Sequence, residues 1–267
     1  MGKVAVVEEK NTLPSLVNSQ MLLEDEGAGQ EGINREDLAI PFLQVLQQLS
    51  PQCNKRDGAY VDGAEAGMII NTVTNELWDG EKGAIVVPVY YTREHVEWKP
   101  RSAGGGFVKS HGPDSSILAA VTRDNEGRDM LPNGNQIVTC GNRYVLIVDE
   151  NGAFTQALIS MSSTQLKISN RWNTMINTLN IPRPDGKGLF NPASFYQAYR
   201  LKTVPQSNDK GSWFGWSVAA EKPTLELPNG EGIYLAARKF RASVMSGDVK
   251  VAQPSPDSGA TDDEIPF

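Results

Sequence analysis

Aromatic and basic side chains occur together in two segments of this chain, and the combination suits the binding of single-stranded nucleic acid. Trp98, Lys99 and Arg101 precede or open a glycine-rich connection, and Phe107 and Lys109 follow it. Aromatic rings stack on bases of any sequence, and lysine and arginine neutralise the phosphate backbone. The other candidates for this nucleic-acid interface are Arg93, Lys167, Arg171, Tyr196, Arg200, Lys202, Trp213 and Trp216.

Two carboxylates and a lysine offer a different chemistry. Asp79, Glu97 and Lys99 imitate the Asp…Glu-x-Lys pattern of magnesium-dependent nucleases, in which the carboxylates hold the metal and the lysine helps to activate water. Glu97 and Lys99 share one face of an alternating strand. Such a pattern arises readily by chance, and Asp79 lies in an ordinary turn. A nuclease is therefore the alternative function, and we predict no catalytic residue.

Cysteine and histidine are too few and too scattered for a structural metal or a disulfide framework. Cys53, Cys140, His95 and His111 form no pair at zinc-ligand spacing. We predict no cofactor and no metal. The N-terminus lacks the pattern of a signal peptide, and no apolar run approaches the roughly 18 residues of a membrane span. We therefore expect a soluble, cytoplasmic protein that makes no contact with a membrane.

The net charge of −7 is concentrated at the two ends of the chain. Residues 1–37 carry 3 basic and 8 acidic side chains, and residues 248–267 carry 1 and 5. The 21 basic and 19 acidic side chains of residues 38–247 leave the body slightly positive. Between Ser163 and Lys202, six basic residues stand against Asp185 alone. This segment can supply the electrostatic footprint of phosphate binding.

Long β-branched and aromatic runs predict a mainly β body. We expect strands at residues 68–73 and 84–98, a hairpin from residues 136–148 to 154–161, and a second hairpin from residues 194–204 to 212–219. The Asn151-Gly152 pair is a strong turn signal for the first hairpin. Pro88 implies an edge or a bend. In the second hairpin, one face should be core while Tyr196, Arg200 and Lys202 point outward.

Three helices should accompany these strands. One begins near Asn34, because Leu38, Phe42, Val45, Leu46 and Leu49 recur near helical spacing, and Pro41 interrupts it or shifts its start. A second runs from a cap at Ser162, Ser163 or Thr164 to about Leu179, and Trp172 on it should be a core anchor. The third runs from Gly230 to about Val244.

The last residues form a displayed peptide. A segment from Gln253 to Ala260, rich in Pro, Ser, Gly and Asp, cannot pack, and it leads to an acidic and apolar tip. An apolar end that carries a carboxylate suits capture in a basic-rimmed hydrophobic pocket of a partner. The predicted partner-binding residues are Asp262, Asp263, Glu264, Ile265, Pro266 and Phe267.

The tip resembles, nearly residue for residue, the acidic C-terminal tip of bacterial single-stranded DNA-binding proteins, including its Ile265-Pro266-Phe267 end. This resemblance covers about seven residues and the linker before them, and the body matches no motif of the bacterial DNA-binding domain. The whole chain looks more like the single-stranded DNA-binding proteins of bacteriophages, which often join a divergent OB domain to an acidic tail that ends in Phe. The order of a strand, a hairpin, a helix and a hairpin is also expected of the OB-fold.

Together these observations predict an α+β protein that is mainly β with flanking helices, built as an OB-like Greek-key barrel with long hairpins. Residues 1–33 would be a mobile acidic arm, residues 34–247 one DNA-binding domain, and residues 248–267 a disordered linker and docking tip. The resemblance implies a non-enzymatic protein that coats single-stranded DNA in replication, recombination and repair. It also implies self-association and recruitment of a polymerase, helicase or nuclease through the tip. A replisome adaptor that does not touch DNA is the second alternative.

Overall fold

The computed structural model describes residues 40–209 and 211–247, together with seven positions between Met21 and Glu31. The chain divides into two compact units, Met1–Leu38 and Ala39–Phe267. All strands in the described residues, and the helices α2 and α3, belong to the second unit. The predicted acidic arm, residues 1–33, lies largely outside the described residues, and the predicted linker and tip, residues 248–267, lie wholly outside them.

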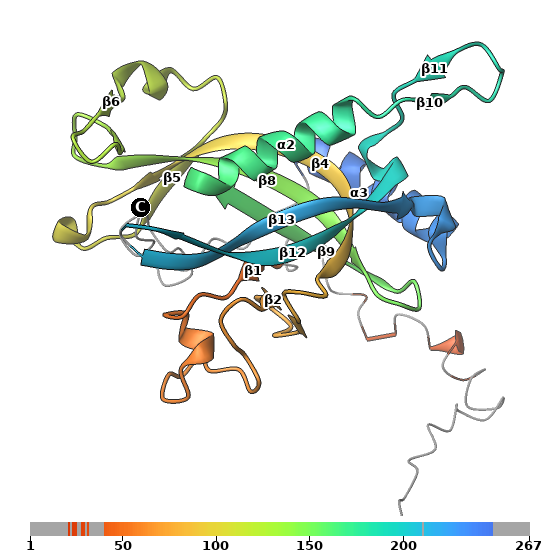
Figure 1. Ribbon diagram of the computed structural model, residues 1–267, viewed down its shortest axis with the longest axis horizontal. Coiled ribbons are helices and arrows are strands. Elements are labelled where there is room, and N and C mark those ends of the chain that lie inside the picture. The colour runs from red at the N-terminus through yellow and green to blue at the C-terminus, as the bar shows by residue number, and fades with distance from the viewer. Residues whose placement is uncertain are drawn as a thin grey trace, which may run out of the picture. The chain divides into compact units, whose positions relative to one another are not determined.

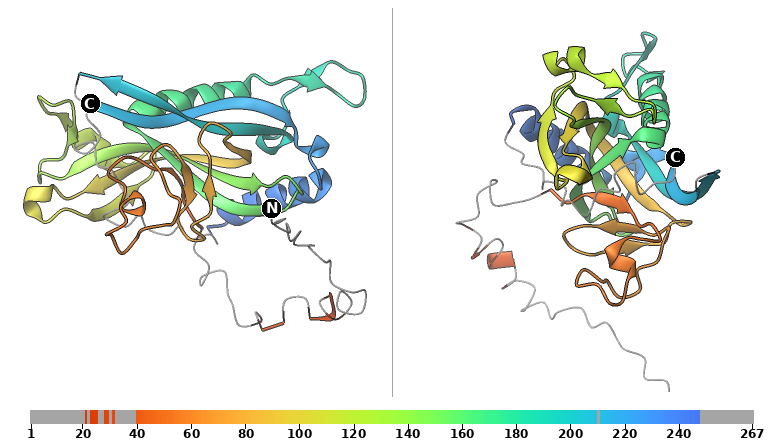
Figure 2. Two further views of the ribbon diagram at one scale, coloured as in Figure 1. Left: turned by 60° about the horizontal axis from the view of Figure 1, so that its bottom comes forward. Right: turned by 90° about the vertical axis from the view of Figure 1, so that its left-hand side faces the viewer.

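Eight strands of the described residues form one antiparallel sheet that curls into a half-barrel (Figure 1; Figure 2). Five of them follow the order β13-β12-β4-β8-β9, and the short strands β5, β6 and β7 extend one end. The bounds of these strands are β4 Ala84–Trp98, β5 Phe107–His111, β6 Thr122–Arg123, β7 Asp129–Met130, β8 Gln136–Val148, β9 Phe154–Ser162, β12 Gln197–Asn208 and β13 Gly211–Pro223. The predicted hairpins are thus present. The first has its predicted bounds to within one residue, whereas the second begins three residues later than predicted and extends further, to Asn208 and Pro223.

Two smaller sheets accompany the main one. The first joins β1 (Leu43–Val45), β2 (Ile69–Asn71) and β3 (Leu77–Trp78). The second is a short hairpin of β10 (Ile181–Pro182) and β11 (Leu189–Phe190), which lies between α2 and β12 in the sequence.

Strand β4 bends in its first half and serves two parts of the sheet. Its register with β8 shifts between Pro88 and Tyr90, as expected for a proline that cannot donate to the ladder. Before the bend, residues 84–86 pair with β12, and near its end residues 95–98 pair with β5. The predicted bend at Pro88 is therefore confirmed. Because of this bend, the first part of β4 pairs with β12, and its last part pairs with β5 in the insertion that follows Trp98.

Helix α2 (Leu166–Asn177) packs its apolar side against one face of the sheet. Trp172 is fully buried there, with its ring 5.5 Å from that of Tyr199, so its prediction as a core anchor is confirmed. The predicted hydroxyl cap is wrong. A 3-10 turn, Ser163–Gln165, precedes the helix, and neither Ser162 nor Gln165 at the two N-cap positions makes a side-chain cap hydrogen bond. The apolar strand residues around the helix include Val86, Val145, Ile159, Leu201 and Val218.

Helix α3 (Gly230–Met245) covers the other face of the sheet, and its predicted bounds are confirmed. Ile233, Ala237 and Phe240 recur at helical spacing and are buried. The Phe240 ring meets the Tyr144 ring of β8 edge to face, with centroids 6.0 Å apart. The sheet is therefore covered by one helix on each side.

The predicted helix near the N-terminal end of the body is wrong from Ile40 onward, and residues 34–39 lie outside the described residues. Residues 43–45 form strand β1, which pairs with β2. The apolar side chains are still core, because Phe42, Leu43 and Leu46 are buried. Pro41 disfavours a helical conformation in the residue before it. Residues 43–45 form a strand because they pair with β2.

Hydrogen bonds from residues outside the main sheet bind backbone groups of its two strands β9 and β13. The carbonyl of Pro41 accepts the amide of Leu158 in β9, at 2.8 Å. The amide group of Gln47 bonds both backbone groups of Phe214 in β13, each at 2.9 Å. Gln165 accepts the amide of Trp216 at 2.8 Å. Because β13 ends the strand order, these two glutamines satisfy backbone groups that a neighbouring strand would otherwise bind.

The prediction of a mainly β protein with flanking helices is confirmed by this architecture. The described helices are all too short or too polar to cross a membrane.

Candidate nucleic-acid interface

The insertion between β4 and β8 presents a preformed aromatic pair. Trp98 ends β4 and Phe107 begins β5, and their rings meet edge to face with centroids 6.0 Å apart and planes at 82°. Both side chains are half-buried, and Lys99 and Lys109 beside them are exposed. Rings held in this way offer a stacking surface at little cost in side-chain entropy. The exposed Lys99 and Lys109 add positive charge to the same insertion.

The glycine-rich connection between Trp98 and Phe107 is a defined turn. The amide of Lys99 donates to the carbonyl of Gly106 at 2.9 Å, which closes its base. Gly104, Gly105 and Gly106 have φ angles of 94°, 63° and 107°. L-residues rarely adopt three such angles in succession, so glycine is required here. Arg101 opens a 3-10 turn in this connection, but its side chain lies outside the described residues.

Glu97 holds the insertion to the sheet. Its carboxylate is only 6% exposed, and it accepts hydrogen bonds from Asn135 (2.6 Å), His111 (2.9 Å) and Asn133 (3.4 Å). These donors, Asn135 first, hold the pKa of Glu97 below its ordinary value of 4.5. Both carboxylate oxygens are therefore occupied by structural partners.

The residues of the nuclease alternative do not converge. Asp79 lies in the turn before β4, where it accepts the amides of Glu81 and Lys82 at 2.9 Å, whereas Glu97 lies at the far end of the same strand. Two carboxylates at opposite ends of a 15-residue strand cannot share one metal ion. Among the described residues, no group of three or more His, Cys, Asp or Glu side chains could hold a metal.

The β12–β13 hairpin brings a further aromatic residue and corrects one prediction. Trp213 is half-buried, and its indole donates to Gln206 across the hairpin at 2.9 Å. Trp216 is only 4% exposed and packs in the core beneath α2, so it cannot stack on a base. Trp213 and Trp216 are three residues apart on one strand and so face opposite sides. The alternation of side chains along a strand was therefore the sequence signal that distinguishes the accessible Trp213 from the buried Trp216.

Arg200 is less available as a cation than predicted. Its guanidinium forms a two-point contact with the carboxylate of Glu221, at 2.9 Å for each bond. That hydrogen-bonded partner raises the pKa of Arg200 and neutralises its charge locally. Lys202 on the same strand is exposed, whereas Tyr196 lies half-buried in the 3-10 turn before β12.

The predicted interface residues lie in three places. The insertion after Trp98 and the tip of the β12–β13 hairpin both project from the same end of the sheet, on the left in Figure 1 and in the left panel of Figure 2. Lys167 and Arg171 are exposed on α2, and Arg93 of β4 reaches that helix by donating to Asn170 at 3.2 Å. Tyr196 and Arg200 lie apart from the insertion. Arg200 pairs with Ile85 near the start of β4, whereas Trp98 is the last residue of that strand.

Sequence reasoning missed a second cluster, built around Arg143. This arginine lies in β8, directly before the apolar residues Tyr144–Val148, and is 4% exposed. A charged residue beside such a run was the available signal, because buried arginines need partners.

Comparison with known proteins gives one match. The model of a family described as Pam3 phage gp34-like protein matches residues 7–250. No curated protein and no solved structure matches the chain.

Proposed function

The chain belongs to the Pam3 phage gp34-like protein family, and from this premise we propose that it is a bacteriophage protein that binds single-stranded DNA without enzymatic activity. It would coat exposed DNA during replication, recombination and repair in the cytoplasm of the host. The observation that carries this proposal is the aromatic pair of Trp98 and Phe107, flanked by exposed Lys99 and Lys109.

The strand order supports an OB-like body. An OB-fold has five strands in a partly open Greek-key barrel, with a helix between the third and fourth strands. Here β4, β8, β9, β12 and β13 follow one another, α2 stands between β9 and β12, and the first strand pairs with both the second and the fourth. In this comparison the insertion after Trp98 corresponds to the loop between strands 1 and 2, and the β12–β13 tip to the loop between strands 4 and 5. Those two loops are the ones that OB-folds use for oligonucleotides.

Partner recruitment is proposed for the C-terminal tip, Asp262 to Phe267, on the grounds of its sequence. Its three carboxylates and its apolar end would dock on a basic-rimmed pocket of a polymerase, helicase or nuclease. Self-association of the protein belongs to the same proposal, because a protein that coats a strand binds beside its own copies.

A titration of the full chain with poly-dT tests the proposal. We expect quenching of tryptophan fluorescence and an affinity that falls steeply with salt. Trp98→Ala should weaken binding by about 1–3 kcal/mol if the ring stacks on a base. Lys99→Glu with Lys109→Glu should weaken binding and flatten the salt dependence.

Lys55→Glu with Arg56→Glu is the matched control, because it makes the same change of charge at two exposed residues of the segment between β1 and β2. It should leave the salt dependence nearly unchanged. Absence of quenching and of any salt-dependent association would refute DNA binding and leave the adaptor that does not touch DNA.

A further inference from the structure

The middle of β4 has an edge that no strand of the described residues occupies. Strand β8 pairs with one edge of β4 from residue 85 to residue 98. On the other edge, β12 pairs only with residues 84–86 and β5 only with residues 95–98. In an antiparallel pair, every second residue points its N–H and C=O groups away from the partner strand. Residues 87–94, the open edge of β4, therefore offer backbone groups to a further strand.

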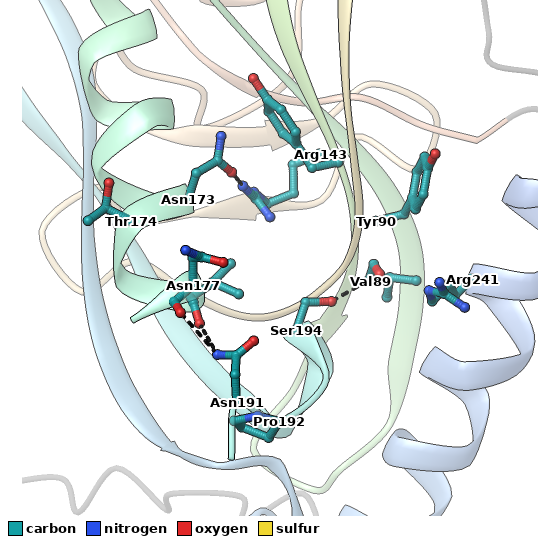
Figure 3. Close-up of a pocket in the computed structure, with 12 residues that line it drawn as sticks. Val89, Tyr90, Arg143, Asn173, Thr174, Asn177, Asn191, Pro192, Ser194 and Arg241 are labelled. Carbon is teal, nitrogen blue, oxygen red and sulfur yellow. Dashed lines mark hydrogen bonds between the residues drawn. The ribbon is translucent and has the colours of Figure 1, made fainter. Parts of the chain in front are cut away.

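A pocket of about 610 Å³ lies beside this open edge (Figure 3). It is lined by residues 89–91 of β4, by the second half of α2, by residues 191–194 and by α3 at Arg241. The hydroxyl of Ser194 donates to the carbonyl of Val89 at 3.1 Å, at the end of the open edge nearer to β12. Since α2 covers one face of the sheet and α3 the other, the pocket leaves room to extend the sheet between the two helices.

Each side of the pocket carries an arginine. Arg143 lies on the α2 side, and its guanidinium carbon is 4.4 Å from the centre of the Trp172 ring and 5.0 Å from that of Tyr91. It donates to Asn173, and its Nε is buried without a hydrogen-bond partner among the described residues. Arg241 lies on the α3 side, so the two arginines flank β4 from opposite faces, as Figure 3 shows. Neither aspartate nor glutamate is among the described residues that line the pocket. A strand added here would therefore meet one uncompensated positive charge on each face.

Residues 4–9 have the sequence of such a strand. Val4-Ala5-Val6-Val7 is a short apolar run of high β-propensity, and Glu8 and Glu9 follow it directly. Neighbouring residues of a strand point to opposite faces of the sheet, so two adjacent glutamates suit one arginine on each face. The segment lies outside the described residues and belongs to Met1–Leu38, the unit separate from the body. The acidic C-terminal tip has no comparable run, and its Pro266 cannot donate to a strand ladder.

We propose that residues 4–9 of the same chain add to the open edge of β4 as a further strand, with Glu8 and Glu9 on opposite faces toward Arg143 and Arg241. The 30 residues between Glu9 and Ile40 tether the segment to the body. A tether of this length keeps it at an effective concentration on the order of a millimolar, which favours the chain's own segment over that of a second copy. The inference does not depend on DNA binding, because it concerns an edge away from the Trp98–Phe107 pair.

Hydrogen exchange of the full chain, followed by mass spectrometry of fragments that cover residues 87–94, tests the proposal. Deletion of residues 2–10 should speed exchange in these fragments by about tenfold or more, because their outward amides lose the added strand. Fragments of β8 should stay protected and report that the body is still folded. A synthetic peptide of residues 2–10, added to the deletion variant, should restore the protection.

Two pairs of substitutions separate strand pairing from other effects of the N-terminal segment. Val6→Pro with Val7→Pro should speed exchange as the deletion does, because proline cannot donate to a ladder. Leu16→Pro with Val17→Pro is the matched control and should leave the exchange unchanged, because it makes the same change outside the proposed strand.

Glu8→Lys with Glu9→Lys should also speed exchange at residues 87–94, because each arginine then faces a like charge. Equal exchange in the full chain and in the deletion variant would overturn the proposal, and so would equal effects of the two proline pairs. Protection that appears only as the protein concentration rises would assign the strand to a second copy and overturn the assignment to the same chain.

Discussion

At the scale of single residues, Glu97 shows how a carboxylate that resembles a catalytic group can be structural. Its three hydrogen-bond donors come from the insertion that carries the proposed interface. The buried carboxylate therefore links the stability of that insertion to pH. The unfolded chain takes up the proton near pH 4.5, before the folded one does, so this contribution is complete above that pH and is lost as the pH falls through the lower folded pKa.

We predict that Glu97→Gln lowers the free energy of unfolding by about 1–3 kcal/mol at neutral pH, because an amide cannot accept all three bonds. The difference from the parent protein should shrink as the pH is lowered below 4.5, where the carboxylate of the parent is itself being protonated. Urea denaturation across this pH range measures it. Glu81→Gln, at an exposed turn residue, is the control. A difference that stays constant down to the lowest pH would contradict the role assigned to Glu97.

At the scale of elements, α2 sits so close to the sheet that one position of β8 must be glycine. A Cβ atom on Gly141 would lie 2.5 Å from the hydroxyl oxygen of Ser169 and 3.2 Å from that of Tyr91. Ser169 is 2% exposed, so its side chain has little room to move. The close approach fixes the height of α2 above β8, and with it the positions of Lys167 and Arg171.

Gly141→Ala should destabilise the protein by about 1–3 kcal/mol, because the extra methyl group overpacks the contact with α2. The same change should cost less when Ser169 is already alanine, because the nearest atom is then gone. Equilibrium unfolding of the two single variants and the double variant measures this coupling. Strict additivity of the three free energies would show that the contact does not limit how closely α2 packs.

Elements with strong local signals could be predicted from the sequence, and those decided by distant partners could not. The run from Ala84 to Trp98 and the helix from Gly230 are where their residue types place them. Residues 43–45 carry a spacing that suits a helix, yet they pair with β2, whose residues lie more than 20 positions away. Local periodicity carries no information on such pairing.

The same distinction holds for the candidate sites. The pair of Trp98 and Phe107 could be proposed because both residues flank one short connection. The pocket around Arg143 could not, because its walls come from β4, α2, α3 and residues 191–194, which meet only in the folded chain. Only the position of a charged residue directly before the apolar run Tyr144–Val148 pointed to it.

At the scale of the whole molecule, charge is divided between acidic ends and a body that carries the basic residues. The tip holds three carboxylates within residues 261–267. If the linker of residues 248–260 is a flexible tether, as its sequence predicts, it would keep these carboxylates at high effective concentration near any basic surface of the same chain. Under the proposed function, the tail would then compete with DNA.

Removal of residues 257–267 should raise the affinity for oligo-dT at low salt and abolish partner recruitment. Fluorescence titration at two salt concentrations measures the first effect, and the gain should vanish at high salt, where charges are screened. A variant with Asp262→Asn, Asp263→Asn and Glu264→Gln keeps the length and the apolar end, and it should show the same gain. Unchanged or weaker binding of DNA by the truncated protein would count against the competition.

The two glutamines that bind the backbone of β13 have a consequence for assembly. Gln47 and Gln165 cover the outer edge of β13 with side chains, which can rotate away at far lower cost than a paired strand can be removed. While they are in place, the backbone groups of Phe214 and Trp216 that they bind cannot pair with another chain. When they swing out, these backbone groups would be free to bind the edge of a second copy. The side-chain conformations of Gln47 and Gln165 would then decide whether copies of the protein join through a continuous sheet or remain apart.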